Sequence, residues 1–460
     1  MTEPSDHTIP TSLIRKYNRP GPRYTSYPTA PHFKADCDRE QLIRAISDPT
    51  CSGKPLSVYV HLPFCESNCW FCGCTKIVTS DHSAADRYLE YLAMELELLS
   101  THLDGSRPLV QLHFGGGTPT FLDAAQLHRL DQLLKTHFIY ADEGEFGVEI
   151  DPRRLCREQI EALASMGFKR ASLGVQDHDP QVQEAVHRIQ PQSLTQQALN
   201  WLREAGFASV NIDLIYGLPL QTESSFAKTV EAVIAQRPER IALFSYAHVP
   251  WIKPTQTIFE RRGNLPDDTT KLAIFEQTTS RLMSAGYEYI GMDHFALPGD
   301  ELLKARENGR LQRNFQGYST HGGADICGLG MSAISQTSGS YRQNHKQLKD
   351  YYTALDEGKL PISGGYLLSQ DDCIRRETIM RLMCDLRLDF QCLSEKLGIE
   401  FADYFSAALE QLQPMAGDGL VRIGNNSLEV TASGRFLIRN IAMHFDAYLD
   451  GSGARYSKTI

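Results

Sequence analysis

The sequence lacks a hydrophobic run long enough to span a lipid bilayer, and its opening residues, MTEPSDHTIPTS, contain no apolar segment typical of a secretory signal. It also contains no internal repeat and no low-complexity tract. The hydrophobic content of 42 % is that of a globular protein. We therefore expect a soluble, cytoplasmic protein without a membrane partner, and its 460 residues should divide into two or three parts.

An excess of positive charge is missing as well. The 46 Lys and Arg residues stand against 56 Asp and Glu residues, a formal net charge of −10, which argues against a nucleic-acid partner. Disulfides are not expected, because cytosolic thiols stay reduced and only four of the eleven cysteines lie together. The others are expected to be ordinary thiols, namely Cys37, Cys51, Cys156, Cys327, Cys373, Cys384 and Cys392.

Three closely spaced cysteines, Cys65, Cys69 and Cys72, follow an apolar, strand-like run at residues 56–61. Their C-x3-C-x2-C spacing allows three thiolates to converge on one soft metal centre. A four-iron cluster usually takes four cysteines, so one iron would remain open to another ligand. A closed zinc site with Cys74 as fourth ligand is an alternative, although structural zinc usually takes two separated cysteine pairs.

Strand-like and helix-like segments alternate from about Leu56 onward. Strands are predicted at residues 57–61, 109–114, 145–150, 170–176, 210–216 and 241–246, and helices at 84–103, 125–137, 160–166, 194–205 and 226–236. Six strands separated by helices predict a parallel sheet with right-handed crossovers. The predicted fold class is therefore α/β, a partial (β/α)6-type barrel rather than a closed eight-stranded one.

Polar residues interrupt strands that should be almost entirely apolar. Glu149, Gln176 and Asp213 lie at or near the C-terminal ends of three predicted strands. Active sites assemble at that end of barrel-type folds, although a single polar residue there is commonly a helix cap or loop contact.

A glycine-rich turn at residues 115–120 follows the second strand and lets the backbone approach a ligand closely. It lacks the Lys-Ser/Thr ending of a phosphate-binding loop.

The cysteine loop resembles that of the radical S-adenosylmethionine (SAM) enzymes, whose open cluster iron binds SAM. Cys74, the preceding residues 59–64, the following residues 76–79 and the N-terminal residues 16–29 are similar to one family in particular, the oxygen-independent coproporphyrinogen III dehydrogenases, also called oxidases. Similar motifs recur as far as about Ile334. The resemblance implies two cofactors, SAM and a 4Fe–4S cluster held by Cys65, Cys69 and Cys72.

The resemblance also implies a set of site residues. SAM would be contacted by Tyr59, Phe71, Gly116, Gly117, Thr118, Glu149, Gln176, Arg188, Asp213, Ala247 and Ile334. We expect Arg188 to face the carboxylate of SAM, and Glu149 or Asp213 to face a ribose hydroxyl. Cys74 is expected to act outside the cluster ligands, in the second sphere or on the substrate side, with a small buried thiol as the alternative.

The activity implied by the resemblance is the oxidative decarboxylation of two propionate side chains of coproporphyrinogen III to vinyl groups. This reaction gives protoporphyrinogen IX in haem biosynthesis without oxygen. A deoxyadenosyl radical made from SAM in a dry pocket would take a hydrogen from each propionate. The implied partners are the porphyrinogen and an electron donor of the flavodoxin or ferredoxin type, and the expected assembly is a monomer. A haem-binding chaperone is the alternative, and such chaperones typically have an aromatic residue at the position of Cys74.

Residues 1–50 are predicted to form an arm on the substrate side of a catalytic barrel with its extension at residues 51–365. The arm contains four cations among tyrosines, Arg15, Lys16, Arg19 and Arg23, and this mixture suits binding of a flat macrocycle with four carboxylates. The alternative is an ordinary basic face exposed to solvent. Arg23 is the expected substrate contact. The stretch 314–320 resembles another substrate-side segment, in which Gln316 would contact the substrate or a second SAM, whereas residues 321–325 depart from the family pattern.

Residues 366–460 are predicted to form a mainly helical domain with a small wing. Helical spacing occurs at residues 374–386, 390–397 and 401–415, and a hairpin pairs residues 419–423 with 428–431. This order resembles a winged-helix DNA reader, but the many acidic residues of the region argue against that function. We expect a lid or packing domain over the barrel mouth.

Overall fold

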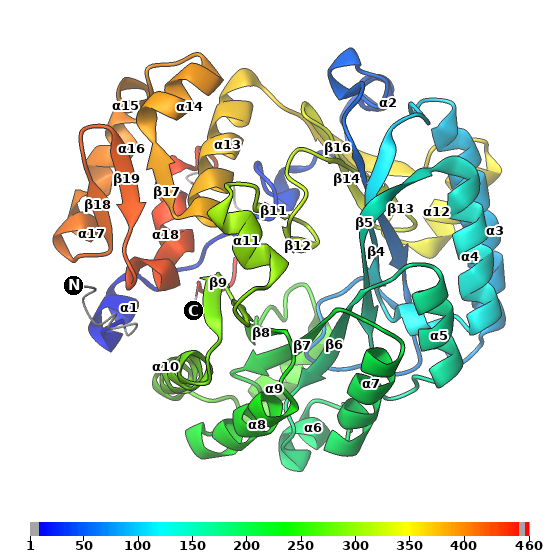
Figure 1. Ribbon diagram of the computed structural model, residues 1–460, viewed down its shortest axis with the longest axis horizontal. Coiled ribbons are helices and arrows are strands. Elements are labelled where there is room, and N and C mark those ends of the chain that lie inside the picture. The colour runs from blue at the N-terminus through cyan, green and yellow to red at the C-terminus, as the bar shows by residue number, and fades with distance from the viewer. Residues whose placement is uncertain (1–8, 450–455, 460) are drawn as a thin grey trace.

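The computed structural model describes residues 9–449 and 456–459 and shows an α/β barrel beside a mainly helical lobe (Figure 1). Six parallel strands lie side by side in the order β1 (Leu56–Leu62), β4 (Pro108–Gly116), β5 (Ile139–Ile150), β6 (Arg170–Gln176), β7 (Ser209–Tyr216) and β8 (Arg240–Ser245). The predicted partial barrel is therefore confirmed. No helix among the described residues is long and apolar enough to cross a membrane.

Helices cover the outer face of these strands (Figure 1). They are α3 (Ser83–Ser100), α4 (Ala124–His137), α5 (Arg157–Ser165), α6 (Pro180–Ala185), α7 (Gln192–Glu204) and α8 (Glu223–Gln236). Several helix starts are explained by local sequence. At α4, for example, the Asp123 side chain accepts from the Gln126 amide and the Gln126 side chain accepts from the Asp123 amide, which satisfies donors that a helix start leaves unpaired.

The sheet continues beyond the six predicted strands at both edges, to twelve strands in all. On one side β13 (Asp325–Leu329) pairs in parallel with β1, followed by the antiparallel β14 (Ile334–Gln336), β15 (Ser340–Asn344) and β16 (Ile362–Leu367). On the other side β10 (His294–Ala296) and β9 (Glu288–Gly291) pair antiparallel. These additions were not predicted because most are too short to show a period in the sequence.

The helical lobe contains the predicted helices and wing with one correction. Its elements are α13 (Gln370–Asp385), β17 (Arg387–Asp389), α14 (Phe390–Leu397), α15 (Phe401–Tyr404), α16 (Ser406–Gln411), α17 (Gln413–Gly417), β18 (Val421–Ile423), β19 (Ser427–Val430) and α18 (Ile438–Ala442). The single helix predicted at residues 401–415 was wrong, because Phe405 leaves helical geometry at φ −104° and ψ 20°. Pro414 starts the third piece, where its missing N–H costs nothing.

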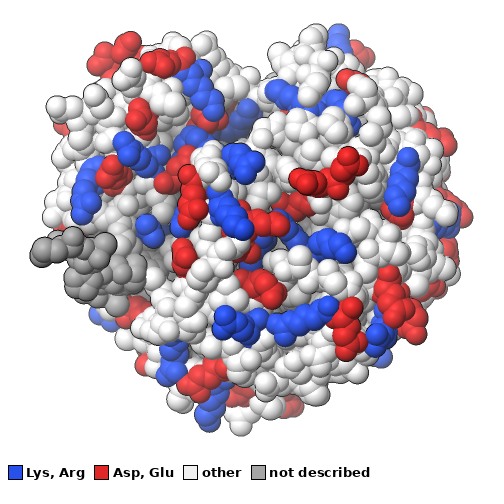
Figure 2. Space-filling model, in the orientation of Figure 1, with Lys and Arg blue, Asp and Glu red and all other residues white. Residues whose placement is uncertain are grey.

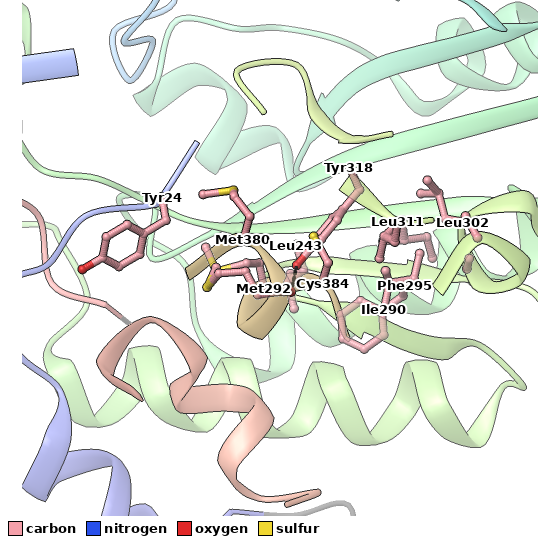
Figure 3. Close-up of a cluster of buried hydrophobic side chains, with 14 of the residues drawn as sticks. Tyr24, Leu243, Ile290, Met292, Phe295, Leu302, Leu311, Tyr318, Met380 and Cys384 are labelled. Carbon is pink, nitrogen blue, oxygen red and sulfur yellow. Dashed lines mark hydrogen bonds between the residues drawn. The ribbon is translucent and has the colours of Figure 1, made fainter. Parts of the chain in front are cut away.

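The other helices and strands lie in the arm, the cysteine loop and the segments between these parts. They are α1 (Thr11–Tyr17), α2 (Arg39–Arg44), β2 (Phe64–Cys65), β3 (Ile77–Val78), α9 (Thr257–Arg262), α10 (Asp268–Ser284), α11 (Glu301–Glu307), β11 (Gln312–Asn314), β12 (Gly317–Ser319) and α12 (Leu348–Asp356). Figure 3 shows the core at the junction, where Met380 and Cys384 of α13 lie near Leu243 of β8 and Tyr318 of β12. The Tyr318 hydroxyl donates to the Met383 carbonyl at 3.2 Å, so α13 is anchored to the barrel.

The described part of the N-terminal arm contacts the helical lobe, α10 and the strands β15 and β16. Lys16 and Tyr17 both donate to Asp418 at 2.5 Å, and Arg15 donates to Thr269 at 3.1 Å. Arg15, Lys16 and Tyr17 thus hold the arm to other elements, and the substrate-side role of the arm stays a prediction. Arg23 is different, because it reaches the barrel.

Candidate active site at the cysteine loop

The cysteine loop leaves β1 at the C-terminal end of the parallel sheet. A short parallel pair closes its base, with Phe64 opposite Ile77 and Cys65 opposite Val78. The Thr79 amide donates to the Cys65 carbonyl at 3.0 Å. The loop therefore starts and ends at one fixed point, which places all its cysteines at the barrel mouth where the sequence predicted a site.

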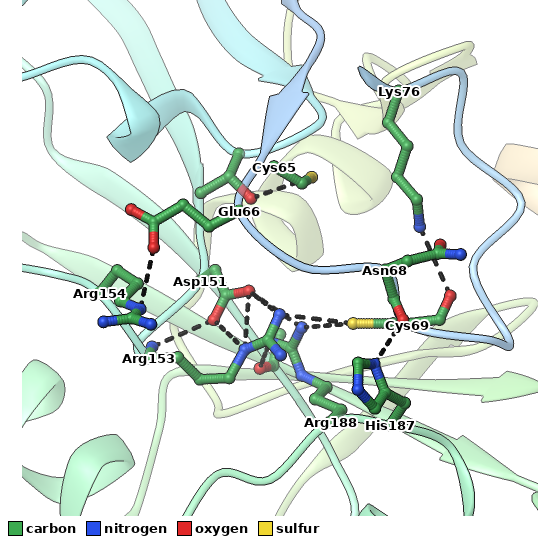
Figure 4. A network of polar contacts seen from close by, with 12 residues as sticks. Cys65, Glu66, Asn68, Cys69, Lys76, Asp151, Arg153, Arg154, His187 and Arg188 are labelled. Carbon is green, nitrogen blue, oxygen red and sulfur yellow. Dashed lines mark hydrogen bonds and ion pairs between the residues drawn. The ribbon is translucent and has the colours of Figure 1, made fainter. Parts of the chain in front are cut away.

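Each predicted cluster ligand has a distinct environment. The Cys65 sulfur lies 3.4 Å from the Thr118 hydroxyl. The Cys69 sulfur accepts from Arg153 at 3.4 Å and from Arg188 at 3.5 Å (Figure 4). A hydrogen bond from Cys74 and the charge of Lys76 lower the pKa of Cys72 well below its usual range, although burial opposes this shift.

The thiol set fits an iron–sulfur cluster better than a single ion. In the part of the chain that the structure describes, no three His, Cys, Asp or Glu side chains converge closely enough to hold one metal ion. A cluster with several irons separates its cysteine ligands more widely than one ion does. Cationic groups beside Cys69 and Cys72 also suit thiolate ligands, since the thiolate is the form that binds metal.

A buried ion-pair network supports the loop from below (Figure 4). Arg188 donates to Asp151 at 3.1 Å and to the Gly174 carbonyl at 2.6 Å, and Arg153 donates to Asp151 at 2.6 Å. Burial opposes ionisation of Asp151, but the two guanidinium groups hold its pKa well below its usual range. Sequence reasoning missed Asp151 and Arg153, although Asp151 directly follows β5 and the strand-end rule that selected Glu149 also applies to it.

The glycine-rich turn packs against the cysteine loop. The Gly117 amide donates to the Leu62 carbonyl and the Thr118 amide to the Phe64 carbonyl, both at 2.8 Å. A Cβ on Gly117 would lie 2.6 Å from the Pro63 carbonyl oxygen, so no larger residue fits. Gly116 has φ +113° and its amide donates to Glu149 at 3.1 Å. The turn is thus fixed to both the loop and β5.

Glu149 and Asp213 face one cavity inside the barrel, with a volume of about 190 Å³. His113 lies 3.5 Å from Glu149 and, together with the Gly116 amide, lowers the pKa of this carboxyl against the opposing effect of burial. Asp213 accepts from Ser172 at 3.0 Å and from Asn211 at 2.7 Å. Burial, followed by repulsion from Glu149, raises the pKa of Asp213 to about 7.

Four further predicted residues do not line this cavity and lie in two groups, Tyr59 with Ile334 and Phe71 with Ala247. A Cβ on Gly115 would lie 3.0 Å from both Tyr59 and Glu149, so these two side chains flank the turn. Tyr59 pairs with Gly328 in β13, and the Ile334 backbone lies directly over Gly328. The buried Gln256 side chain donates to the Phe71 carbonyl at 3.0 Å and to the Ala247 carbonyl at 3.3 Å. The structure therefore brings Phe71 and Ala247 together.

Gln176 and Arg188, which both lie against Gly174, each have a buried polar atom without a partner in the described part of the chain. Gln176 has φ +71° at a bulge between β6 and β7, and its Oε1 is unpaired. The Nε of Arg188 is unpaired as well. Unpaired buried polar atoms are costly, and here they indicate that a polar ligand completes the site. Together with three thiols and a glycine turn, they fit SAM beside a cluster.

The two residues expected on the substrate side also approach the cavity. Arg23 forms an ion pair with Asp293, and its guanidinium lies 5.5 Å from the ring centre of Phe244, which lines the cavity. Gln316 lines the cavity too; its Nε2 donates to Ser57 at 3.4 Å, whereas its Oε1 is unpaired among the described residues. Both side chains thus lie where a ligand inside the barrel could meet them.

Comparisons with known proteins agree with this geometry. The profile of the Radical SAM superfamily matches residues 59–233, and that of the HemN C-terminal domain matches residues 368–437. The oxygen-independent coproporphyrinogen III oxidase of Pseudomonas aeruginosa is 46% identical over 454 residues, covering 97% of this chain and 98% of the relative. The Escherichia coli K12 protein of the same name is 46% identical over 438 residues, covering 95% of each chain.

A solved structure matches almost the whole molecule. The coproporphyrinogen III oxidase of Escherichia coli, described as a radical SAM enzyme, has a TM-score of 0.90 and 44% identity to this chain, covering 96% of this chain and 99% of that one. The identity and coverage are far above what a shared fold alone would give. The chain therefore belongs to the oxygen-independent coproporphyrinogen III oxidase family of the radical SAM superfamily.

Proposed function

We propose that the protein converts coproporphyrinogen III to protoporphyrinogen IX by oxidative decarboxylation of two propionate side chains, without oxygen, in haem biosynthesis. The observation that carries the proposal is the three-cysteine loop set over a barrel cavity that holds Glu149 and Asp213. Relatives that match nearly the full chain carry the name of this activity. In each round a propionate loses one hydrogen atom, one electron and carbon dioxide, and a vinyl group remains.

As a radical SAM enzyme the chain uses a 4Fe–4S cluster and SAM, which when bound supply the one-electron chemistry that removes a hydrogen atom. Cys65, Cys69 and Cys72 are the proposed cluster ligands. Glu149 stays ionised at neutral pH because its pKa is lowered, so it can accept hydrogen bonds from a ribose or an ammonium group. The unpaired Nε of Arg188 is a donor suited to the carboxylate of SAM.

Cys74 has a proposed role outside the cluster. Its thiol is exposed. A hydrogen bond to Cys72 raises the pKa of Cys74 well above its usual range, and the negative charges of Cys72 and Glu149 raise it further. A thiol that stays protonated beside the cavity can donate a hydrogen bond or a hydrogen atom to a bound molecule. We therefore propose a substrate-side role for Cys74, and for Arg23 and Gln316 contact with the substrate or a second SAM.

The proposed arrangement of the chain is an arm at residues 1–50, a barrel with its extension at residues 51–365 and a helical domain at residues 366–460. The HemN C-terminal profile begins at residue 368, close to the last boundary. We also propose a cytoplasmic monomer that receives electrons from a flavodoxin- or ferredoxin-type protein. Sedimentation of the purified protein tests the monomer, and reduction of the cluster by each donor under anaerobic conditions tests the electron source.

The activity is tested by an anaerobic assay of the reconstituted protein with SAM, a reductant, an electron acceptor and coproporphyrinogen III. We expect protoporphyrin after oxidation of the products, and no product from Cys69→Ser. Cleavage of SAM without any decarboxylated product would contradict the proposal and would favour a haem-handling relative. Absence of iron in the reconstituted parent protein would contradict the cluster assignment itself.

A further inference from the structure

A large basic cleft lies between α13 of the helical lobe and the edge of the sheet. Its volume is about 730 Å³, comparable to sites for drug-sized or larger ligands. Six cations line it, namely Lys54, Arg310, Arg313, Arg376, Arg381 and Lys396. Figure 2 shows the molecule hollowed between the lobe with α13 and the part with α2 and β16, with Lys and Arg side chains along the hollow.

The acidic side chains of the basic cleft do not neutralise it. Two carboxylates, Asp325 and Glu377, line the same space. Asp325 is paired at 2.6 Å with Arg107, which lies outside the cleft, and Glu377 pairs with Lys396 at 2.6 Å. Arg381 of the cleft pairs in turn with Asp385, which lies outside it, at 3.1 Å, so Asp385 offsets the charge of Arg107. Six cations against two carboxylates therefore leave an excess of four positive charges in a protein whose formal net charge is −10. Such a local field attracts a polyanion.

One cation of the basic cleft is buried with an unused donor. Arg313 is 4 % exposed and its Nη1 has no hydrogen-bond partner among the described residues. Its Nε donates to the Arg23 carbonyl at 3.3 Å, and its guanidinium lies 4.9 Å from the ring centre of Tyr318. A buried, unpaired guanidinium donor is costly, so an anionic ligand at this position would satisfy it.

The basic cleft adjoins the barrel cavity but lies away from the cysteine loop. Leu56 pairs with Asp325 where β1 and β13 begin, so the cleft lies at the opposite strand ends from the loop. The β11–β12 hairpin separates the two spaces: Arg313 lines the cleft and stacks on Tyr318, which lines the cavity. Thr320 of the cleft likewise donates to Glu145 of the cavity at 2.6 Å.

We propose that the basic cleft is a second tetrapyrrole site, where the four-carboxylate substrate binds before it reaches the barrel cavity. The inference rests on the proposed function for the identity of the ligand. Four excess positive charges match four propionates, and carboxylates bind guanidinium groups with good geometry. A product that has lost two carboxylates makes fewer of these contacts, so the cleft favours substrate over product.

The test uses two cations that the fold does not need. Neither the Lys54 ammonium nor the Arg310 guanidinium forms an ion pair or hydrogen bond with a described side chain or carbonyl. The variant Lys54→Gln/Arg310→Gln is compared with Lys169→Gln/Lys228→Gln, a control that removes the same number of positive charges at residues that do not line the cleft. Circular dichroism, iron content and SAM cleavage should match the parent in both variants.

The probes are coproporphyrin III, a stable four-carboxylate form of the ligand, and protoporphyrin IX, which has two. We expect the cleft variant to weaken coproporphyrin III binding about tenfold at low salt, with a smaller effect on protoporphyrin IX, and the control to match the parent. The KM for coproporphyrinogen III should rise in the same variant while kcat stays constant.

Equal coproporphyrin III affinity in the cleft variant and the parent would overturn the proposal, as would an equal loss for both porphyrins. Because porphyrin binding is measured without turnover, it tests the second tetrapyrrole site independently of the proposed enzymatic function. Binding through the cleft without any vinyl product would refute the proposed function alone. Normal turnover with unchanged affinity and KM in the cleft variant would refute the second site alone.

Discussion

Glu149 and Asp213 line the same cavity, but their environments shift their pKa values in opposite directions. His113 and the Gly116 amide outweigh burial at Glu149 and lower its pKa, whereas the neutral donors Ser172 and Asn211 do not offset burial at Asp213, whose pKa rises to about 7. One carboxyl is therefore ionised at neutral pH and the other is about half protonated. An ionised carboxylate attracts a cationic ligand, whereas a protonated carboxyl group does not, so the two acids differ in their attraction for such a ligand.

The first prediction is that SAM affinity rises with pH up to about 7 and then levels off. SAM carries a positive sulfonium charge, so the ionised form of Asp213 binds it better, and binding lowers the Asp213 pKa from its free value of about 7. Below that value binding must release a proton, which weakens it. Equilibrium dialysis of the anaerobic cluster-loaded protein from pH 5.5 to 8.5 measures the slope.

The matched variant is Asp213→Asn, which keeps the shape and cannot ionise. Its SAM affinity should be flat across this range and about tenfold weaker than that of the parent at pH 8, the size of one charge-assisted contact. Glu149→Gln should weaken binding by a similar factor but leave the slope of the parent unchanged, because Glu149 is already ionised. If the SAM affinity of the parent protein did not change with pH, the charge of Asp213 would not affect SAM binding.

The second prediction separates Cys74 from the cluster ligands. Cys69→Ser replaces a soft thiolate with a poor iron ligand, so we expect loss of the cluster and of SAM cleavage. Cys74→Ser should retain iron and SAM cleavage but lose most of the porphyrinogen turnover. Iron and sulfide analysis, electron paramagnetic resonance and product assays measure these outcomes. Loss of iron from Cys74→Ser to the same extent as from Cys69→Ser would make Cys74 a ligand.

At the scale of elements, a single buried glutamine ties the cysteine loop to the chain that follows β8. Gln256 is 0 % exposed, donates to the Phe71 and Ala247 carbonyls, and accepts from the Val249 amide at 2.7 Å. All three contacts are to backbone atoms. The loop position therefore depends on a residue that lies far from every cysteine in the sequence, and no motif could reveal it.

The third prediction is that Gln256→Ala destabilises the protein by roughly 2–4 kcal/mol, because it leaves several buried backbone groups without partners. The cluster should also release iron to a chelator several times faster than in the parent. Urea unfolding and the rate of colour loss under anaerobic conditions measure the two effects. The control is Gln391→Ala on α14, an exposed residue whose side chain donates a hydrogen bond to Glu395. Equal iron-release rates would show that Gln256 does not hold the loop.

The elements that the sequence predicted well are those with strong local signals. The strand predicted at residues 170–176 coincides with β6, and the helix predicted at residues 390–397 coincides with α14. The cysteine loop, the glycine turn and the strand-end acids also came from local pattern. The short strands at both sheet edges depend on neighbours distant in sequence, as do the contacts of Asp151, Gln256 and Arg313, so no single window of residues contains them.

At the scale of the whole molecule, one buried cation of the helical lobe holds both the arm and the C-terminal residue Thr459. Arg439 is 6 % exposed; its Nε donates to the Pro22 carbonyl at 2.9 Å, its Nη1 donates to the Thr459 carbonyl at 3.0 Å, and it also donates to the Gly21 carbonyl. The arm residue Arg23 follows directly and pairs with Asp293 beside the barrel cavity. The lobe thus positions the part of the arm that reaches the site.

The fourth prediction is that Arg439→Ala releases the arm and weakens substrate binding without touching the cluster. Three backbone carbonyls lose their donor, and leaving a buried polar group without its partner typically costs about 1–3 kcal/mol. Trypsin should then cut after Arg23, which Tyr24 follows, several times faster, while iron content stays at the level of the parent. Arg422→Ala on the exposed face of β18 is the control.

The same variant distinguishes two roles for the helical lobe. If the lobe acts on the site through the arm, Arg23→Ala should reproduce the loss of coproporphyrin III affinity seen in Arg439→Ala, and the double variant should be no weaker than either alone. Independent, additive losses would instead mean that the lobe contacts the ligand by itself, for example through the α13 face of the basic cleft. Arg439 donates to the carbonyl of Pro22, the residue directly before Arg23, so loss of Arg439 should also displace Arg23. We therefore expect the non-additive result.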